Sequence, residues 1–209
     1  MLIAASKNRS AEQIAALAKL GVQHFGENYV QEAASKRVEV EQILSAELHT
    51  AQLPAQGLTW HLVGTLQRNK VQTALNLFAI LQAVDSLRIA ETINRRVESG
   101  RCPILLEVFM GDDPTRPGFR PSELPSALER LSQLQQLDVQ GLMTVAPLGL
   151  QEVQIRQVFA ELRELRDRAR SGAPGLNLQH LSMGMTEDYH LAIPEGSTMV
   201  RIGRALFGA

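Results

Sequence analysis

Four lysines limit the imine chemistry that this chain can carry out. Apart from Lys7, Lys19, Lys36 and Lys70, every basic residue is an arginine, and a guanidinium stays protonated near neutrality and cannot form an imine. Lys7 ends a short apolar run, IAASK, where its amine can act as a nucleophile toward a carbonyl compound. The alternative interpretation is an ordinary solvated lysine in a loop.

The C-terminal stretch LSMGMTEDYHLAIPEGSTMVRIGRALFG contains residues typical of an anion site. Ser182, Gly184 and Thr186 precede a predicted helix with acidic residues in its first turn, so hydroxyls and free N–H groups can hold an anion there. Gly203, in VRIG, allows close approach of backbone. Phosphate sites recur after the seventh and eighth strands of α/β barrels. The alternative is two glycine-containing loops that serve only to turn the chain.

Two further predicted strands end in polar residues, in HFGENYVQE and WHLVGTLQRNK. Glu27 and Asn28 follow the first of these strands, and such residues can be helix caps and nothing more. His24 and His61 fall within the strand patterns, where a hydrogen-bonded core histidine is the more common role than a catalytic one.

Short apolar runs alternate with segments of helical period, which predicts βα units around a parallel sheet. Eight strands are expected, at residues 2–5, 23–25, 59–63, 78–83, 104–109, 137–143, 178–182 and 198–202. Seven helices are expected between them, at residues 11–20, 29–48, 66–75, 86–99, 121–134, 150–169 and 186–192. The fold class is therefore α/β, a TIM-type (βα)8 barrel spanning residues 1–209 as a single domain, with one helix missing from its outer ring. We expect either a native chain that starts upstream of Met1 or a neighbouring subunit that covers the seam between the first and last strands.

Composition narrows the class of function. The 21 basic and 22 acidic residues are spread without blocks, so we expect a small-molecule ligand and neither a nucleic acid nor a membrane partner. Cys102 is the single cysteine, which argues against a disulfide or a thiolate metal site, and no metal is expected. The chain contains no apolar run of membrane-spanning length and no signal peptide, so a cytoplasmic protein is expected.

Six stretches together carry a resemblance to a known family: IAASK, HFGENYVQEAASK, WHLVGTLQRNK, the glycine of TRPGF, GLMTVAP and the C-terminal stretch quoted above. In this order they resemble the signature stretches of the pyridoxal phosphate homeostasis protein family, single-domain relatives of the barrel domain of alanine racemase. The match covers nearly the whole chain.

The resemblance implies pyridoxal 5'-phosphate (PLP) as the cofactor and Lys7 as the residue that carries it as an internal aldimine. It implies that Asn28 lies near the cofactor ring and that Arg201 faces the pyridine nitrogen. The phosphate-binding stretch falls on Ser182, Gly184, Thr186 and Gly203. Because a guanidinium can only donate to the ring nitrogen, the pyridine would stay neutral and be a poorer electron sink.

The chain departs from the family's pattern at Thr65, Arg68 and Arg116. The role of the Thr65 position is therefore in doubt. A leading helix that relatives carry before the lysine strand is also missing, in agreement with the helix count.

The resemblance implies an intracellular PLP homeostasis protein without robust turnover, in transient contact with PLP enzymes, as a monomer or a dimer. An amino-acid racemase is the first alternative. It needs a second base on the opposite face of the substrate, and the two tyrosines, Tyr29 and Tyr189, lie at predicted helix starts or interiors. A Schiff-base aldolase acting on a phosphorylated substrate is the second alternative, which only the resemblance disfavours.

Overall fold

Eight parallel strands close into a barrel in a computed structural model that describes residues 1–46, 57–173 and 175–208. The strands are β1 (Leu2–Ala5), β2 (His24–Glu27), β3 (Thr59–Leu62), β4 (Ile80–Val84), β5 (Cys102–Glu107), β6 (Leu137–Met143), β7 (His180–Met185) and β8 (Met199–Ile202). Each strand pairs with the next along the chain, and β1 pairs with β8, where Ile3 lies opposite Arg201. The predicted α/β barrel is confirmed.

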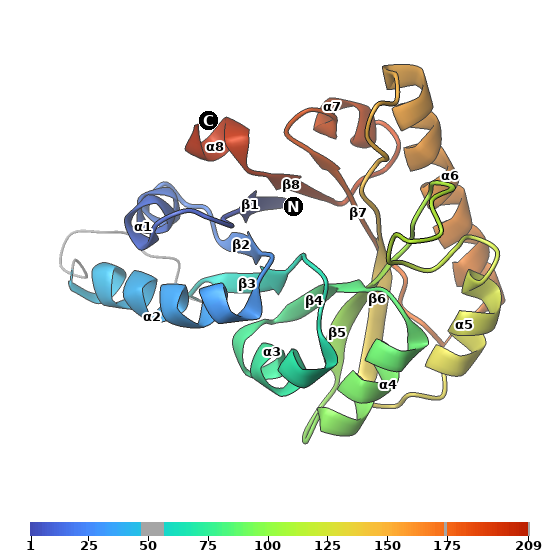
Figure 1. Cartoon of the computed structure of the whole chain (residues 1–209), viewed down its shortest axis with the longest axis horizontal. Coiled ribbons are helices and arrows are strands. Elements are labelled where there is room, and N and C mark those ends of the chain that lie inside the picture. The colour runs from blue at the N-terminus through green and yellow to red at the C-terminus, as the bar shows by residue number, and fades with distance from the viewer. Residues whose placement is uncertain (47–56, 174, 209) are drawn as a thin grey trace.

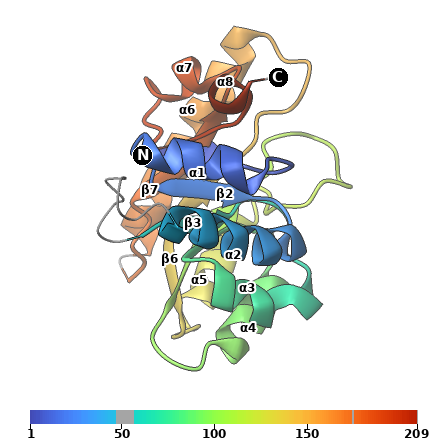
Figure 2. The same ribbon diagram turned by 90° about the vertical axis from the view of Figure 1, so that its left-hand side faces the viewer.

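The helices lie around the outside of the strands (Figure 1). They are α1 (Ala11–Lys19), α2 (Val30–Ala46), α3 (Val71–Leu77), α4 (Leu87–Arg96), α5 (Leu124–Leu131), α6 (Glu152–Gly172), α7 (Tyr189–Ala192) and α8 (Arg204–Phe207), with a 3-10 turn at Arg68–Lys70 before α3. Figure 2, turned by 90°, shows α1, α2, α3 and α4 one after another down one side of the barrel.

Local sequence signals explain where several elements begin. Ser10 and Gln13 form the capping box of α1, in which the Ser10 hydroxyl accepts from the Gln13 amide and the Gln13 side chain accepts from the Ser10 amide. Ser86 caps α4 by accepting from the amide of Ile89. The last two residues of the predicted helix 29–48 lie outside the described residues.

The expected count of seven helices is wrong because α8 was missed. RALF is four residues long, too short to show a helical period. α8 lies near the start of α1 (Figure 1), where the Arg9 guanidinium donates to the Gly208 carbonyl and stands 5.6 Å from the centre of the Phe207 ring. The seam between β1 and β8 is thus hydrogen-bonded, and α8 is fastened to the segment that follows β1.

Apolar side chains fill two separate regions. The larger lies between strands and helices, with Phe25, Leu62 and Phe159 among its fully buried members. The smaller is formed by strand residues alone, Ile3, Ala83, Leu105, Met143 and Met199. Because successive strand residues face opposite sides, this second cluster occupies the inside of the barrel.

Candidate functional site

Four neighbouring strand ends bring the predicted site residues to one mouth of the barrel. β7, β8, β1 and β2 are consecutive in the closed sheet, and their carboxyl ends share an edge. Lys7 follows β1, Asn28 follows β2, Thr186 follows β7 and Gly203 follows β8. A Cβ at Gly203 would lie 3.4 Å from the carbonyl oxygen of Ala5, so the ends of β8 and β1 are in close contact. Active sites of α/β barrels form at this end of the strands.

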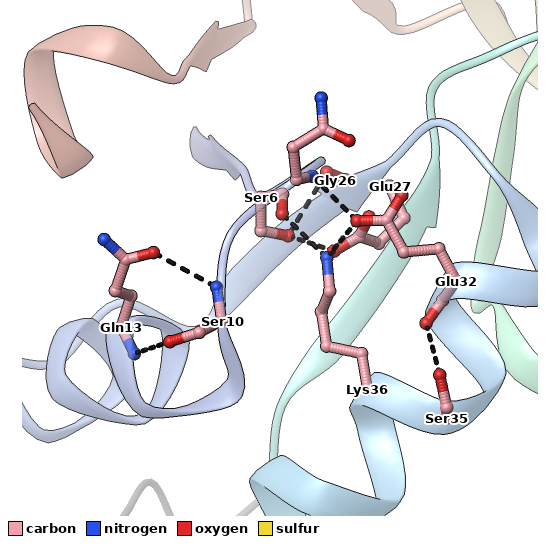
Figure 3. Close-up of polar contacts among 9 residues, drawn as sticks. Ser6, Ser10, Gln13, Gly26, Glu27, Glu32, Ser35 and Lys36 are labelled. Atoms are coloured by element: carbon pink, nitrogen blue, oxygen red, sulfur yellow. Dashed lines mark hydrogen bonds and ion pairs between the residues drawn. The ribbon is translucent and has the colours of Figure 1, made fainter. Parts of the chain in front are cut away.

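Lys7 lies in a tight turn after β1, with an exposed side chain. The next residue, Asn8, has φ 59°, a left-handed conformation that asparagine tolerates better than most residues. Figure 3 shows the polar contacts that hold this turn: the Ser6 hydroxyl donates to Glu27 Oε1 at 2.7 Å, and Lys36 Nζ donates to the Ser6 carbonyl at 2.9 Å. The turn that presents Lys7 is therefore anchored to β2 and α2.

Lys36 is a buried cation that bridges two carboxylates outside the barrel wall. Its ammonium lies 2.8 Å from Glu27 Oε1 and 2.6 Å from Glu32 Oε1, and Glu32 also accepts from the backbone N–H of Asn8 at 2.7 Å (Figure 3). Burial raises the pKa of Glu27, against the lowering effect of Lys36 and Ser6. We call Lys36, Glu27, Glu32 and Ser6 the clamp. Sequence reasoning missed the role of Lys36, although it stands one helical turn after Glu32, the i,i+4 spacing of an ion pair.

Arg201 enters the mouth from inside the barrel with 5% of its surface exposed. Its Nη1 donates to Ser182 Oγ at 2.6 Å and its Nη2 donates to the Thr144 carbonyl at 2.8 Å. Burial lowers the pKa of Arg201 to about 10, which still leaves the guanidinium protonated at neutral pH. These two bonds use two of the five N–H donors of an arginine, so the side chain can donate to a further acceptor.

Thr186 and Gly203 meet at the mouth, whereas Ser182 lies deeper. The Gly203 N–H donates to Thr186 Oγ1 at 3.3 Å. Ser182 has no exposed surface, and its hydroxyl donates to Gln82 Oε1 at 2.6 Å while accepting from Arg201. The Ser182 hydroxyl therefore already donates its hydrogen bond to Gln82, inside the barrel.

The predicted helix over residues 186–192 is wrong at its start. α7 begins at Tyr189, and Asp188 is its N-cap, with Oδ1 accepting from the Met185 amide at 2.6 Å. Thr186 and Glu187 lie in the turn before it. Gly184 has φ +97°, and a Cβ there would lie 2.8 Å from the Ala192 side chain. Glycine at this position therefore allows β7 to pack tightly against α7.

Asn28 is half-buried beside a cavity of about 420 Å³ that Thr65, Gln67 and Lys70 also line. A Cβ at Gly64 would lie 2.5 Å from the Asn28 carbonyl oxygen, so the chain after β3 runs directly against the backbone of Asn28. The structure therefore places Thr65, one of the departures from the family's pattern, at the edge of the mouth.

Two carboxyl groups at the mouth were not predicted as site residues from the sequence. Glu107 ends β5, and Asp85 follows β4. Burial and the nearby Asp85 raise the pKa of Glu107 to about 7, although Arg201 and Arg116 oppose the shift. Its Oε2 atom is buried without a hydrogen-bond partner. A charged residue at the end of the apolar run CPILLE was the available signal.

His24 and His61 lie inside the barrel, as the core-histidine interpretation predicts. Their ring nitrogens, His24 Nδ1 and His61 Nε2, are 3.1 Å apart, and Gln82 Nε2 lies 2.9 Å from His61 Nδ1. Burial lowers the pKa of His61 to about 3, with a further contribution from His24.

The described residues contain no cluster of three or more histidine, cysteine, aspartate or glutamate side chains that could bind a metal ion. Within the same part of the chain, no helix combines the length and the apolar character needed to cross a membrane.

The match to a family model defines the class of this barrel. Residues 4–209 match the model for the N-terminal domain of alanine racemase. Alanine racemase from Corynebacterium glutamicum shares the fold, with a TM-score of 0.75 at 16% identity over 100% of this chain and 55% of that one.

Closer relatives define the particular family. The pyridoxal phosphate homeostasis protein of Pseudomonas aeruginosa is 36% identical over 100% of this chain and 84% of its own length, and that of Escherichia coli K12 is 33% identical over 100% and 85%. PipY of Synechococcus elongatus, solved with PLP bound, has a TM-score of 0.88 at 42% identity, covering 100% of this chain and 92% of PipY. The chain belongs to the pyridoxal phosphate homeostasis protein family, as the sequence motifs predicted.

Proposed function

We propose that this chain binds PLP at the mouth of its barrel, through an imine linkage to Lys7, and takes part in PLP homeostasis. The single observation that carries the proposal is the meeting, at one barrel mouth, of an exposed lysine and a buried protonated arginine. Lys7 follows β1, and Arg201 lies on the adjacent β8. The PLP-bound relative and the names of the curated relatives support the same conclusion.

The residues present fit the chemistry of PLP. Arg201 has N–H donors beyond its two bonds to Ser182 and Thr144, which suits the lone pair of a pyridine nitrogen. The groups proposed to hold the phosphate are the backbone of Gly184 together with Thr186 and Gly203, which are hydrogen-bonded to each other at the mouth. The unpartnered Oε2 of Glu107 is a buried polar atom at the same mouth, of the kind that a polar ligand would satisfy.

The protein groups at the mouth favour holding PLP over demanding catalysis. When bound, PLP supplies an electrophilic carbon and an electron sink. Arg201 keeps the ring nitrogen unprotonated because a guanidinium donates a hydrogen bond without giving up its proton, and this weakens that sink. The clamp fixes the backbone of the Lys7 turn, and Asn28 lines the ring side of the mouth in this proposal.

Absorbance of the purified protein tests the proposal. We expect a band near about 420 nm after PLP is added, and we expect Lys7→Ala to abolish it. Lys19→Ala is the matched control, since Lys19 lies at the far end of α1, and it should retain the band. A native protein that stays colourless and takes up no PLP would overturn the proposal.

Enzyme assays test the homeostasis role separately from binding. Racemase and aminotransferase activities should be weak or absent in the PLP-loaded protein. Robust turnover of alanine would contradict the homeostasis role and show that the protein is an enzyme. It would not contradict the proposed PLP site.

A further inference from the structure

A continuous series of side-chain hydrogen bonds crosses the inside of the barrel. It starts at Arg201 on β8, passes through Ser182 on β7, Gln82 on β4 and His61 on β3, and ends at His24 on β2. The contact distances along the series are 2.6, 2.6, 2.9 and 3.1 Å. We call these five side chains the relay. It links the candidate ring-nitrogen site to the opposite end of the barrel, where β2 begins.

The chemistry of the donors gives the relay one direction. Arg201 can only donate, so Ser182 Oγ accepts from it, and the Ser182 hydroxyl donates its own proton to Gln82 Oε1. This orientation of the Gln82 amide points its N–H toward His61 Nδ1.

His61 must then accept at Nδ1 and carry its proton on Nε2. That proton is donated to His24 Nδ1, which leaves the proton of a neutral His24 on Nε2 as well. This arrangement of protons satisfies all four contacts and also gives the Ser182 proton an acceptor.

The opposite tautomer of His61 would leave the Ser182 proton without an acceptor in the relay. With a proton on His61 Nδ1, the Gln82 amide would have to turn its oxygen toward His61 and its N–H toward Ser182. Ser182 Oγ has two acceptor sites and would then accept from both Gln82 and Arg201, so its own buried proton would have no acceptor in the relay. The proton position on His61 thus decides whether Ser182, the hydroxyl that accepts from Arg201, has an acceptor for its own proton.

Burial makes this arrangement costly to change. Ser182, Gln82 and His61 have no exposed surface. A donor among them that lacks an acceptor in the protein therefore cannot hydrogen-bond to water instead. His24 is half-buried and is the end of the relay that lies nearest to solvent.

We propose that Gln82 and His61 are positioning residues for Arg201, which hold its guanidinium at the barrel mouth through the one-way relay. Both side chains are buried without exposed surface, and each would act through Arg201. The inference rests on the proposed function for the role of Arg201 toward the pyridine nitrogen, but the relay itself is a property of the protein without PLP.

Nitrogen-15 NMR of the histidine rings in the PLP-free protein tests the direction of the relay. We expect His24 and His61 both to be neutral and protonated at Nε2, with signals assigned by loss in His24→Asn and His61→Asn. A His61 ring protonated at Nδ1 would overturn the proposal.

PLP titration of matched variants tests the positioning role. In His61→Asn the side-chain oxygen can replace Nδ1 as the acceptor for Gln82, so PLP affinity should stay within about twofold of wild type. His61→Leu offers no acceptor, and affinity should fall about fivefold, the scale of one neutral hydrogen bond. Affinity is measured on samples shown by circular dichroism to be folded.

His180→Leu is the control for removing a strand histidine. His180 lies on β7 outside the relay, with Nδ1 3.3 Å from Thr198 Oγ1, and PLP affinity should not change. Equal affinities for His61→Asn and His61→Leu would overturn the proposal. If wild type binds no PLP, the proposed function fails instead, and the NMR measurement still decides whether the relay exists.

Discussion

Two buried cations, Lys36 and Arg201, are held in opposite ways. Lys36 is 7% exposed, lies between β2 and α2, and contacts two carboxylates within 2.8 Å. Arg201 is 5% exposed, lies inside the barrel, and its hydrogen bonds go to a hydroxyl and a carbonyl. The charge of Lys36 is neutralised by direct contact, whereas the charge of Arg201 is solvated by neutral oxygens.

This difference separates a structural cation from one that can serve a ligand. A buried ion pair is stable only while both partners remain, because removing one leaves an uncompensated charge in a low-dielectric interior. Arg201 leaves no buried carboxylate in hydrogen-bond contact when it is removed, and it still has donors to offer at the barrel mouth. We therefore expect substitutions of Lys36 to act on folding and substitutions of Arg201 to act on binding.

The largest effect on stability is expected for Lys36→Met, which removes the cation of the clamp and leaves the charges of Glu27 and Glu32 uncompensated. The free energy of unfolding should fall by about 3 kcal/mol, measured by urea denaturation at pH 7. The control is Arg168→Met, which removes an exposed pair with Glu164 at 3.7 Å and should cost less than about 0.5 kcal/mol. Equal losses of unfolding free energy in the two variants would show that the clamp stabilises the fold no more than an exposed ion pair does.

A smaller effect on stability and a larger one on binding are expected for Arg201→Gln. Glutamine can still donate to a neighbour but has no charge, so PLP affinity should fall at least about tenfold, the scale of a charge-assisted hydrogen bond. Absorbance titration measures the affinity, and urea denaturation should show a smaller loss than in Lys36→Met. The comparison breaks down if Arg201→Gln unfolds as readily as Lys36→Met yet binds PLP as wild type does.

A third prediction is a pH dependence of stability caused by Glu107. Its pKa of about 7 in the folded chain lies above the ordinary value of 4.5, so between these pH values the folded state binds more protons than the unfolded state. Stability contributed by this group is therefore present at low pH and is lost as pH rises from about 4.5 to 7. Glu107→Gln should be more stable than wild type at pH 8 and close to it at pH 5, by urea denaturation. A wild type and variant that differ equally at both pH values would contradict this assignment.

Sequence periodicity and motifs predicted the barrel and the family, and both predictions are confirmed. The β1 and β6 bounds and the capping box at Ser10 agree with the structure because each depends on a local pattern. Other bounds moved by a few residues: β7, expected at residues 178–182, runs from His180 to Met185. A short apolar run in the sequence does not show at which residue the hydrogen-bonded pairing of two strands ends.

The predicted site residues Lys7, Asn28, Gly184, Thr186, Arg201 and Gly203 all lie at or near the barrel mouth, and their roles toward PLP stay predictions. Ser182 could not be assigned to the interior from sequence, because a one-residue change in strand register decides which way a side chain faces. The relay and the clamp were also missed. The members of the relay, such as Ser182 and Gln82, are far apart in the chain. Glu32 and Lys36 of the clamp are only four residues apart, but this spacing is common in helices.

The clamp has a chemical consequence beyond stability. An ammonium that donates to three oxygens and is shut away from solvent cannot act as an amine toward reagents in solution. Of the four lysines in the chain, Lys36 is thereby shielded from any reactive aldehyde that the protein carries or meets. The composition is rich in arginine and poor in lysine. Together with the burial of Lys36 in the clamp, it leaves Lys7, Lys19 and Lys70 as the lysine amines that a carbonyl compound could meet.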